Sequence, residues 1–439
     1  MKKKSNELRG RLSAMALAVV MCMGTVISAF AAGDPIFGTE DAPAAAAITK
    51  NLIMPVGTTT PDATFTFQFS PVSVDDRTTP GDLDTMPTVG PTTIAFTASD
   101  IGTDIGTVPG TDIVGFKTIL KQSGDVLSGV SFPHAGVYVY NIVENSSVTG
   151  YTPGDNETYV FSPAQYALTV YVKNGVNGLY VAAVASSITV NDSSNQTSDP
   201  GDKVDPTPQP GDPNITGNYS KIMFTNTYSK TAGGVDPTDP NNHVLTIGKA
   251  VSGDYADRTK YFAFQITATQ PGVVQGSATY KAYVLDSGNN VVTSEDNTSN
   301  LQTDGNDYSY IEFTSGVTET VNLKHDQKLV FTDLHIGAKY VAVESAVEYY
   351  TASALVVENG GGPIQIFNSL ENLALSTGTK LIGENANSAA FTNTYRTITP
   401  TGVIINNLPF VMILVLAAGA FAAFVVIKSR KKRNYVPHR

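Results

Sequence analysis

Phe224-Thr225-Asn226-Thr227-Tyr228 occurs a second time, unchanged, as Phe391-Thr392-Asn393-Thr394-Tyr395. Threonine alternates with Phe, Asn and Tyr in both copies, which is typical of a β-strand with one buried face. Because side chains alternate across a strand, the asparagine shares a face with the two aromatic residues. Both copies therefore predict an amide side chain inside a hydrophobic core.

Two further elements repeat in the same order. Ile48-Thr49-Lys50 corresponds to Ile247-Gly248-Lys249, and the Tyr- and Val-rich stretches 136–144 and 337–344 both end in glutamate. The spacing from lysine to glutamate is 94 residues in the first copy and 95 in the second. A shared order at matched spacing predicts two copies of one domain.

The intervening sequence favours β-structure throughout. Short runs of Val, Ile, Thr, Tyr and Phe are separated by clusters of Gly, Pro, Asn and Asp. This pattern predicts an all-β protein with two tandem β-sandwich domains, over residues 32–229 and 243–396. The polar segment 230–242 is the predicted linker. A second polar segment, 191–214, is the predicted surface insertion of the first domain, and its aspartates lack the loop template of a calcium site.

The N-terminal residues 1–31 are typical of a secretory signal peptide. A basic start is followed by an apolar run and by the small-residue cleavage motif Ala29-Phe30-Ala31. The single cysteine, Cys22, lies inside this segment, and a lipoprotein cysteine is the less favoured interpretation of it. One cysteine in 439 residues excludes a disulfide framework and a cysteine-rich metal site, and a net charge of −11 argues against nucleic-acid binding.

The C-terminal residues 397–439 combine three elements. Residues 408–427 carry no charge and are long enough to span a bilayer, and a basic tail follows them. Ile398-Thr399-Pro400-Thr401-Gly402 stands just upstream, so the arrangement resembles the cell-wall sorting signal of Gram-positive bacteria, with isoleucine and threonine replacing the usual leucine and first proline. The resemblance implies transient membrane insertion and then sortase cleavage between Thr401 and Gly402. An ordinary single-pass anchor is the alternative.

The lysine and the glutamate of each repeat also face the predicted core. Burying these charged side chains is costly even when they form an ion pair. One interpretation is such a buried pair with an asparagine beside it. The other is that burial favours a neutral amine and a neutral acid, so that the amine attacks the asparagine carbonyl while the glutamate moves protons. This interpretation predicts two intramolecular isopeptide bonds, Lys50–Asn226 with Glu144 as proton shuttle and Lys249–Asn393 with Glu344.

Several stretches together resemble the backbone pilins of streptococcal sortase-assembled pili, the pilin isopeptide-linkage family. They are ITKNL with the following FTFQF, GVYVYNIVEN, LTIGKAVSGDYADRTKYFAF, both FTNTY segments and the terminal PTG, within residues 45–402. The resemblance implies two tandem Ig-like sandwiches, each with a self-formed isopeptide bond, and neither cofactor nor metal. It also implies a secreted, cell-wall-anchored pilus subunit whose partners are a sortase, other copies of itself, and minor pilins or peptidoglycan.

Family members use one lysine of the first domain, shortly before its last strand, to accept the next subunit. The matching position is Lys221, although the interval to the asparagine is about two residues shorter here. Lys173 is the alternative, in a motif that lacks the family's proline.

Two functions remain open at this level. A covalently polymerised shaft pilin is favoured over a non-polymerising wall-anchored adhesin or minor pilin, because no third, adhesive region is visible. An extracellular enzyme has little support, since the five histidines are scattered and no nucleophile motif is present.

Overall fold

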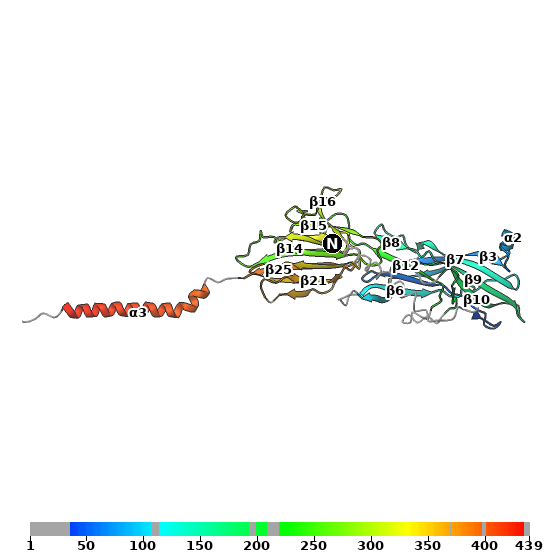
Figure 1. The fold of residues 1–439 in the computed structure, drawn as a ribbon, viewed down its shortest axis with the longest axis horizontal. Coiled ribbons are helices and arrows are strands. Elements are labelled where there is room, and N and C mark those ends of the chain that lie inside the picture. The colour runs from blue at the N-terminus through cyan, green and yellow to red at the C-terminus, as the bar shows by residue number, and fades with distance from the viewer. Residues whose placement is uncertain are drawn as a thin grey trace, which may run out of the picture.

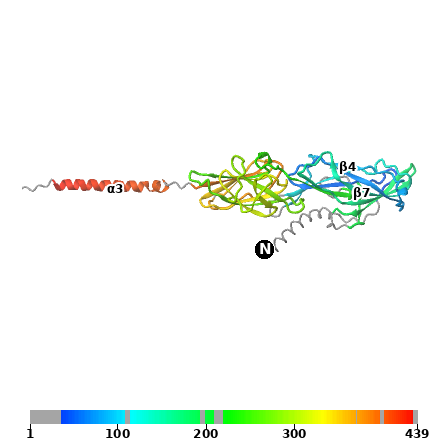
Figure 2. The same cartoon turned by 90° about the horizontal axis from the view of Figure 1, so that it is seen from above.

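The computed structural model describes residues 36–107, 114–192, 199–208, 219–368, 370–396 and 401–433. Two β-domains lie end to end, and the helix α3 (Thr401–Arg433) extends beyond the second one (Figures 1 and 2). Within the described residues, the other helical elements are the short α2 (Pro80–Leu83) and the 3-10 turn η1 (Pro240–Asn242). The predicted all-β fold of the two domains is confirmed, and α2 is a helical turn that the sequence did not predict.

The first domain is built from two sheets. One has the order β1 (Ile36–Phe37), β10 (Leu179–Val190), β9 (Gln165–Asn174), β7 (Gly136–Thr149), β3 (Thr64–Val74) and β4 (Thr92–Ala95), with β11 (Lys203–Val204) paired to β10. The other has the order β5 (Thr103–Thr107), β6 (Val114–Gln122), β2 (Thr49–Pro55), β12 (Met223–Lys230) and β8 (Glu157–Val160).

The second domain repeats this plan. Its larger sheet has the order β16 (Leu301–Thr303), β17 (Ser309–Thr314), β15 (Thr279–Leu285), β19 (Lys328–Phe331), β13 (Leu245–Ser252), β25 (Asn387–Tyr395), β21 (Tyr350–Val357) and β22 (Ile364–Phe367). Its smaller sheet has the order β18 (Thr318–Leu323), β14 (Phe262–Thr269), β20 (Lys339–Glu344) and β23 (Leu375–Ser376), with β24 (Lys380–Leu381) paired to β20.

Each domain has one main core between its two sheets. In the first domain, Phe65 and Phe67 of β3 pack in one cluster with Tyr140 of β7 and Phe224 of β12. The corresponding cluster of the second domain includes Phe391 of β25. These strands alternate buried and less buried residues, as the period-two pattern predicts, because one face of each sheet packs against its partner sheet.

In each domain the first and last long strands are parallel neighbours. β2 pairs with β12 in the first domain and β13 with β25 in the second. A parallel pair cannot be closed by a short hairpin, so nearly the whole domain lies between its two strands.

The two domains contact each other directly. The Glu384 carboxylate of the second domain accepts a hydrogen bond from the Thr59 amide at 3.1 Å and lies 3.6 Å from the Lys230 Nζ. Gly337 has φ +79°, and a Cβ at this position would lie 2.3 Å from the Pro55 Cβ, so only glycine allows this close approach. The predicted linker also contributes, because the Ala232 amide donates to the Leu334 carbonyl at 3.0 Å.

The predicted terminal segments are described only in part. The signal peptide and residues 397–400 of the sorting motif lie outside the described residues. Thr401 and Gly402 begin α3, and the predicted span over residues 408–427 falls on this helix. Within the described part of the chain, no helix is both long enough and apolar enough to cross a membrane.

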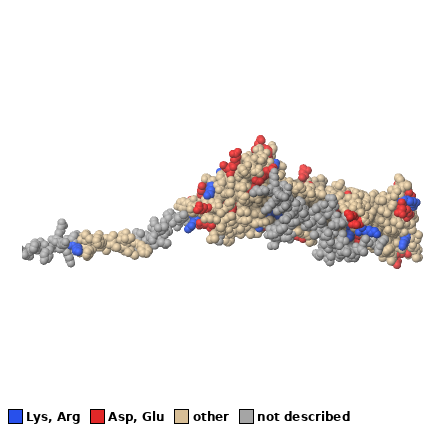
Figure 3. All heavy atoms as spheres, viewed as in Figure 1, with Lys and Arg blue, Asp and Glu red and all other residues tan. Residues whose placement is uncertain are grey.

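The acidic side chains are spread over both domains. Figure 3 shows Asp and Glu scattered across the visible face rather than gathered in one patch. Such a distribution favours solubility and mutual repulsion over binding of one anionic or cationic partner.

Candidate functional site

The first candidate site begins with the parallel pair β2 and β12. Lys50 is paired with Phe224, and Leu52 with Asn226, so the lysine and the asparagine are offset by two positions. An offset of two keeps both side chains on the same face of the sheet. Both residues are fully buried, as the predicted parity requires.

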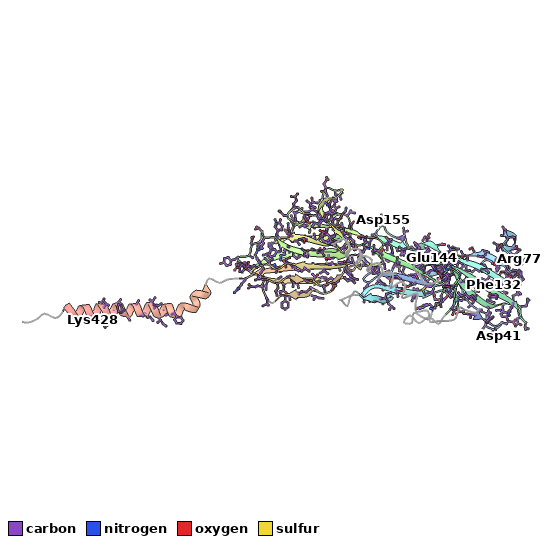
Figure 4. The ribbon with its side chains drawn as sticks, viewed as in Figure 1. Asp41, Arg77, Phe132, Glu144, Asp155 and Lys428 are labelled. Carbon is purple, nitrogen blue, oxygen red and sulfur yellow. The ribbon has the colours of Figure 1, made fainter. Side chains whose placement is uncertain are left out.

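Glu144 comes from the opposite sheet. It lies on β7, paired with Phe67 of β3, and Figure 4 shows it inside the first domain. Its carboxylate lies 2.8 Å from the Lys50 Nζ and accepts a hydrogen bond from the Asn226 Nδ2 at 2.9 Å. The structure therefore brings both Lys50 and Asn226 into contact with Glu144 across the core.

Burial controls the charges of this site. The side chains of Lys50 and Glu144 have no exposed surface. Burial lowers the pKa of Lys50 to about 8, and the nearby Glu144 opposes this shift. Burial raises the pKa of Glu144, against the opposing effects of Lys50, Asn226 and the Ser162 amide. Both shifts favour the neutral form of the pair, and the Phe65 ring, 4.8 Å from the Lys50 Nζ, adds an apolar wall.

Two residues that sequence reasoning missed complete this site. The Ser162 amide donates a hydrogen bond to the Asn226 Oδ1 at 2.7 Å. The Ser162 hydroxyl bonds to the Asp192 carboxylate, which also accepts the Thr225 amide at 3.2 Å. Asp192 lies in the insertion that was predicted to be a solvated loop, yet burial raises its pKa to about 7. No local pattern distinguishes Asp192, because its role depends on contacts with Ser162 and Thr225, which are distant in the sequence.

The second candidate site has the same register. Lys249 is paired with Phe391 and Val251 with Asn393, while Glu344 is paired with Phe264 on the opposite sheet. The Lys249 Nζ lies 2.5 Å from the Glu344 Oε1, and neither side chain has exposed surface. The Lys249 Nζ also lies 4.0 Å from the centre of the Phe262 ring.

The pKa shifts of the second site have the same directions as those of the first site, but the surroundings of its asparagine amide differ. Burial lowers the pKa of Lys249 to about 8 and raises that of Glu344, with Lys249 and Asn393 opposing the second shift. However, the Asn393 Oδ1 and the Glu344 Oε2 are buried without a hydrogen-bond partner. No counterpart of the Ser162 amide therefore reaches this asparagine carbonyl within the described structure.

Both arrangements can support the same chemistry. Each places a lysine with a lowered pKa, a carboxyl with a raised pKa and a primary amide in one dry enclosure. A lysine amine is a nucleophile when neutral, and the fold holds the amide beside it as the electrophile. In the first site the carboxyl contacts both the amine and the amide, so it can move a proton between them. In the second site the carboxyl contacts the amine.

The comparisons with known proteins match the two domains to separate families. Residues 46–229 match a protein family described as the Spy0128-like isopeptide containing domain. This match covers the first β-domain, which carries Lys50, Glu144 and Asn226. Residues 243–395 match a second family, described as a domain of unknown function, DUF7601. A search of the curated proteins finds no match.

Solved structures of pilus proteins are also similar to this chain. The major pilin from Streptococcus pyogenes is 19% identical, covering 80% of this chain and 99% of its own, with a TM-score of 0.30. The T-13 major pilin protein of the same species is 17% identical, covering 82% and 99%, with a TM-score of 0.29. A pilus-presented adhesin is 19% identical, covering 53% and 36%, with a TM-score of 0.22.

The two candidate linkage lysines occupy different environments. Lys221 is half-buried just before β12, and its amide donates to the Asp205 carbonyl at 2.7 Å. Burial lowers the pKa of Lys221, and Asp205 opposes this shift. Lys173 is exposed near the end of β9, paired with Tyr180 of β10. Neither lysine belongs to the two buried sites.

Metal binding was not predicted for this protein. Among the described residues, no group of three His, Cys, Asp or Glu side chains is placed to hold a metal ion. The carboxylates closest to the buried lysines, Glu144 and Glu344, are engaged with those lysines.

Proposed function

We propose that this protein is the shaft subunit of a covalent pilus, stabilised by the self-formed bonds Lys50–Asn226 and Lys249–Asn393. A sortase would cleave between Thr401 and Gly402 and join the threonine carbonyl to a lysine of the next subunit. The observation that carries the proposal is the pair of buried Lys, Glu and Asn sets with one shared register. Proteins of this family are structural, so the autocatalytic bonds would be the chain's own chemistry.

The bonds explain why such costly residues are buried. An ion pair between Lys50 and Glu144 would leave two charges in a low-dielectric core, which usually contributes little net stability. Conversion of the lysine to an amide removes its charge. Each bond would also link the first and last long strands of a domain and close a loop of more than 100 residues. A crosslink of this kind lowers the conformational entropy of the unfolded chain, which stabilises the fold by roughly 5 kcal/mol.

The direction of the strands supports head-to-tail polymerisation. β12 runs from Lys221 towards the second domain, since its end at Lys230 contacts Glu384. β25 runs parallel to β13, which begins next to the linker, so it ends at the pole remote from the first domain. The acceptor Lys221 and the donor Thr401 therefore lie towards opposite poles of the subunit, as a linear polymer requires.

The competing proposal is a wall-anchored adhesin or minor pilin with the same domains. The adhesin would have the same internal bonds, but its cleaved Thr401 would be joined to the cell wall instead of to a lysine of the next subunit. The sorting motif and the membrane span are predictions common to both. Polymerisation through a lysine is therefore the property that separates them.

The intact mass of the protein tests the internal bonds. We expect the mass to be lower than the sequence mass by two molecules of ammonia, because each Lys–Asn bond releases one. Asn226→Ala and Asn393→Ala should each restore one ammonia, after the substitution itself is taken into account. An unmodified mass for the parent protein would refute both bonds.

Stability against pH gives a second test, through the variant Asn226→Ala. This variant keeps Lys50 unlinked, with a pKa of about 8 in the folded state against 10.5 for the ordinary side chain. Between these values the unfolded chain binds more protons, so the folded state gains stability as pH rises. In the linked parent, this nitrogen is an amide and does not titrate.

We therefore expect the stability deficit of Asn226→Ala, relative to the parent, to shrink by about 2 kcal/mol between pH 8 and pH 10. Urea unfolding of both proteins at several pH values measures it. Asp192, whose pKa is about 7, titrates below this window. A deficit that stays constant would show that Lys50 keeps an ordinary pKa.

A further inference from the structure

The Asn226 amide is held at both ends by different groups. Its Nδ2 donates to the Glu144 Oε1 at 2.9 Å, and its Oδ1 accepts from the Ser162 backbone amide at 2.7 Å. An N–H group requires an acceptor, so the Ser162 amide fixes which end of the side chain is the oxygen. Glu144 consequently contacts the nitrogen that would leave, and the carbonyl oxygen is polarised by a different group.

The chain course makes the Ser162 amide available. β8 is paired with β12 from Glu157 to Val160, where Val160 stands opposite Thr227. The strand ends there, and Ser162 precedes Pro163, which has no N–H to continue a ladder. The Ser162 amide therefore points to the side chain of Asn226 instead of a backbone carbonyl.

Asp192 holds this amide in place. Its carboxylate accepts the Ser162 hydroxyl on one side and the Thr225 amide on the other. Thr225 directly precedes Asn226 on β12, so Asp192 ties the donor to the strand that carries the acceptor. Ser162 is buried, which strengthens its hydrogen bond to the amide oxygen.

Among its described residues, the second domain has no backbone amide that donates to the asparagine carbonyl. β21 stays paired with β25 along its whole length, and Ala352 stands opposite Asn393. The backbone N–H groups of β21 that face β25 are used by the sheet, and the Asn393 Oδ1 is buried without a partner. The two sites thus share Lys and Glu geometry but differ at the carbonyl oxygen.

We propose that the Ser162 backbone amide is an oxyanion donor that accelerates formation of the Lys50–Asn226 bond, with Asp192 as its positioning residue. This inference rests on the proposed isopeptide chemistry. The neutral Lys50 Nζ attacks the Asn226 Cγ, and the C=O electron pair moves to Oδ1, where the Ser162 N–H stabilises the charge. The Glu144 acid protonates Nδ2 and takes a proton from Nζ, after which the C–Nδ2 bond breaks and one ammonia leaves.

A rate difference between the domains follows. Removing one oxyanion donor typically slows a reaction by about 10²- to 10³-fold. The Lys50–Asn226 bond should therefore form faster than the Lys249–Asn393 bond, although both lysines have a pKa of about 8.

Time-resolved synthesis of the full chain tests the proposal. The protein is made by cell-free translation, aliquots are quenched in acid and denaturant, and the two crosslinked peptides are quantified by mass spectrometry. In the main variant, the α-hydroxy acid analogue of serine at position 162 replaces the N–H by an ester oxygen. Ser162→Pro removes the same N–H, and Ser162→Ala is the matched control that keeps it.

We expect the ester and Ser162→Pro to slow formation of the Lys50–Asn226 bond about 10²- to 10³-fold. Ser162→Ala keeps the N–H but loses the hydroxyl contact to Asp192, so it should slow the bond by less and measures the positioning effect alone. The Lys249–Asn393 bond should form at an unchanged rate and reports that the chain folds. If Ser162→Pro prevents folding of the first domain, the rate measured for the ester variant provides the test. A parent-like rate in the ester variant overturns the proposal, and the absence of both crosslinks in the parent refutes the isopeptide chemistry itself.

The pH profile separates a direct role from an indirect one. The Ser162 amide also lowers the pKa of Glu144, so its removal could act through the proton shuttle. A donor to the oxyanion lowers the rate at every pH. A rate profile that merely shifts along the pH axis, with an unchanged maximum, would assign the effect to Glu144 and overturn the proposal.

Discussion

Replacing Glu344 with alanine is expected to leave Lys249 and Asn393 unlinked and to make the second domain extensible under load. The variant loses the proton shuttle, so the amide cannot release ammonia. It also leaves a buried lysine unpaired, which alone typically costs about 3–5 kcal/mol. Loss of the crosslink lowers the free energy of unfolding by roughly another 5 kcal/mol.

The extension follows from the direction of the strands. Tension in the proposed polymer enters at Lys221, passes through the linker into the start of β13 and leaves at the end of β25. These two strands are parallel, so pulling shears them against each other. The Lys249–Asn393 bond would carry the load directly from one strand to the other. Without it, each residue between them adds about 3.3–3.6 Å when the domain unfolds.

Single-molecule pulling between residue 221 and the C-terminal end measures this. Asn393→Ala should extend like Glu344→Ala while keeping the Lys249–Glu344 ion pair, which separates the effect of the bond from that of the charge. Glu144→Ala is the matched control, because load from Lys221 travels along β12 without crossing the Lys50–Asn226 bond. This variant should lose thermal stability but extend no more than the parent. An inextensible Glu344→Ala chain would contradict the prediction.

Replacing Lys221 with alanine is expected to convert the covalent polymer on the parent cell to monomer. Lys221 is half-buried and its pKa is lowered by burial, so more of it is neutral and nucleophilic than of an ordinary surface lysine. Its place at the start of β12, away from the second domain, suits attack on the Thr401 carbonyl of the next subunit. Denaturing gels of boiled cell-wall extracts measure the ladder of polymers.

Lys173→Ala is the control for this experiment and should keep the full ladder. The Lys221→Ala protein should still lose two ammonias, because neither buried site involves this lysine. A ladder that persists in Lys221→Ala but disappears in Lys173→Ala would reassign the acceptor. A single wall-released band from the parent protein would favour the adhesin.

The sequence by itself determined the strands and the members of each buried set. Alternation placed Asn226 on the face of Phe224 and Tyr228, and the same parity applied to the lysine and glutamate strands, because the period of a strand is local. The repeat then supplied the second set. These residues come together because parallel pairing of the first and last long strands offsets Lys50 and Asn226 by two positions.

Only the tertiary structure decided the rest. The Ser162 amide reaches Asn226 because β8 stops at Val160, and Asp192, just after β10, reaches Ser162 and the Thr225 amide. Neither contact leaves a periodic signal in the sequence. The path of load likewise depends on which strands lie side by side and in which direction they run. A strand's face is set by its own alternating side chains, whereas hydrogen bonds between distant segments are set by packing of the whole domain.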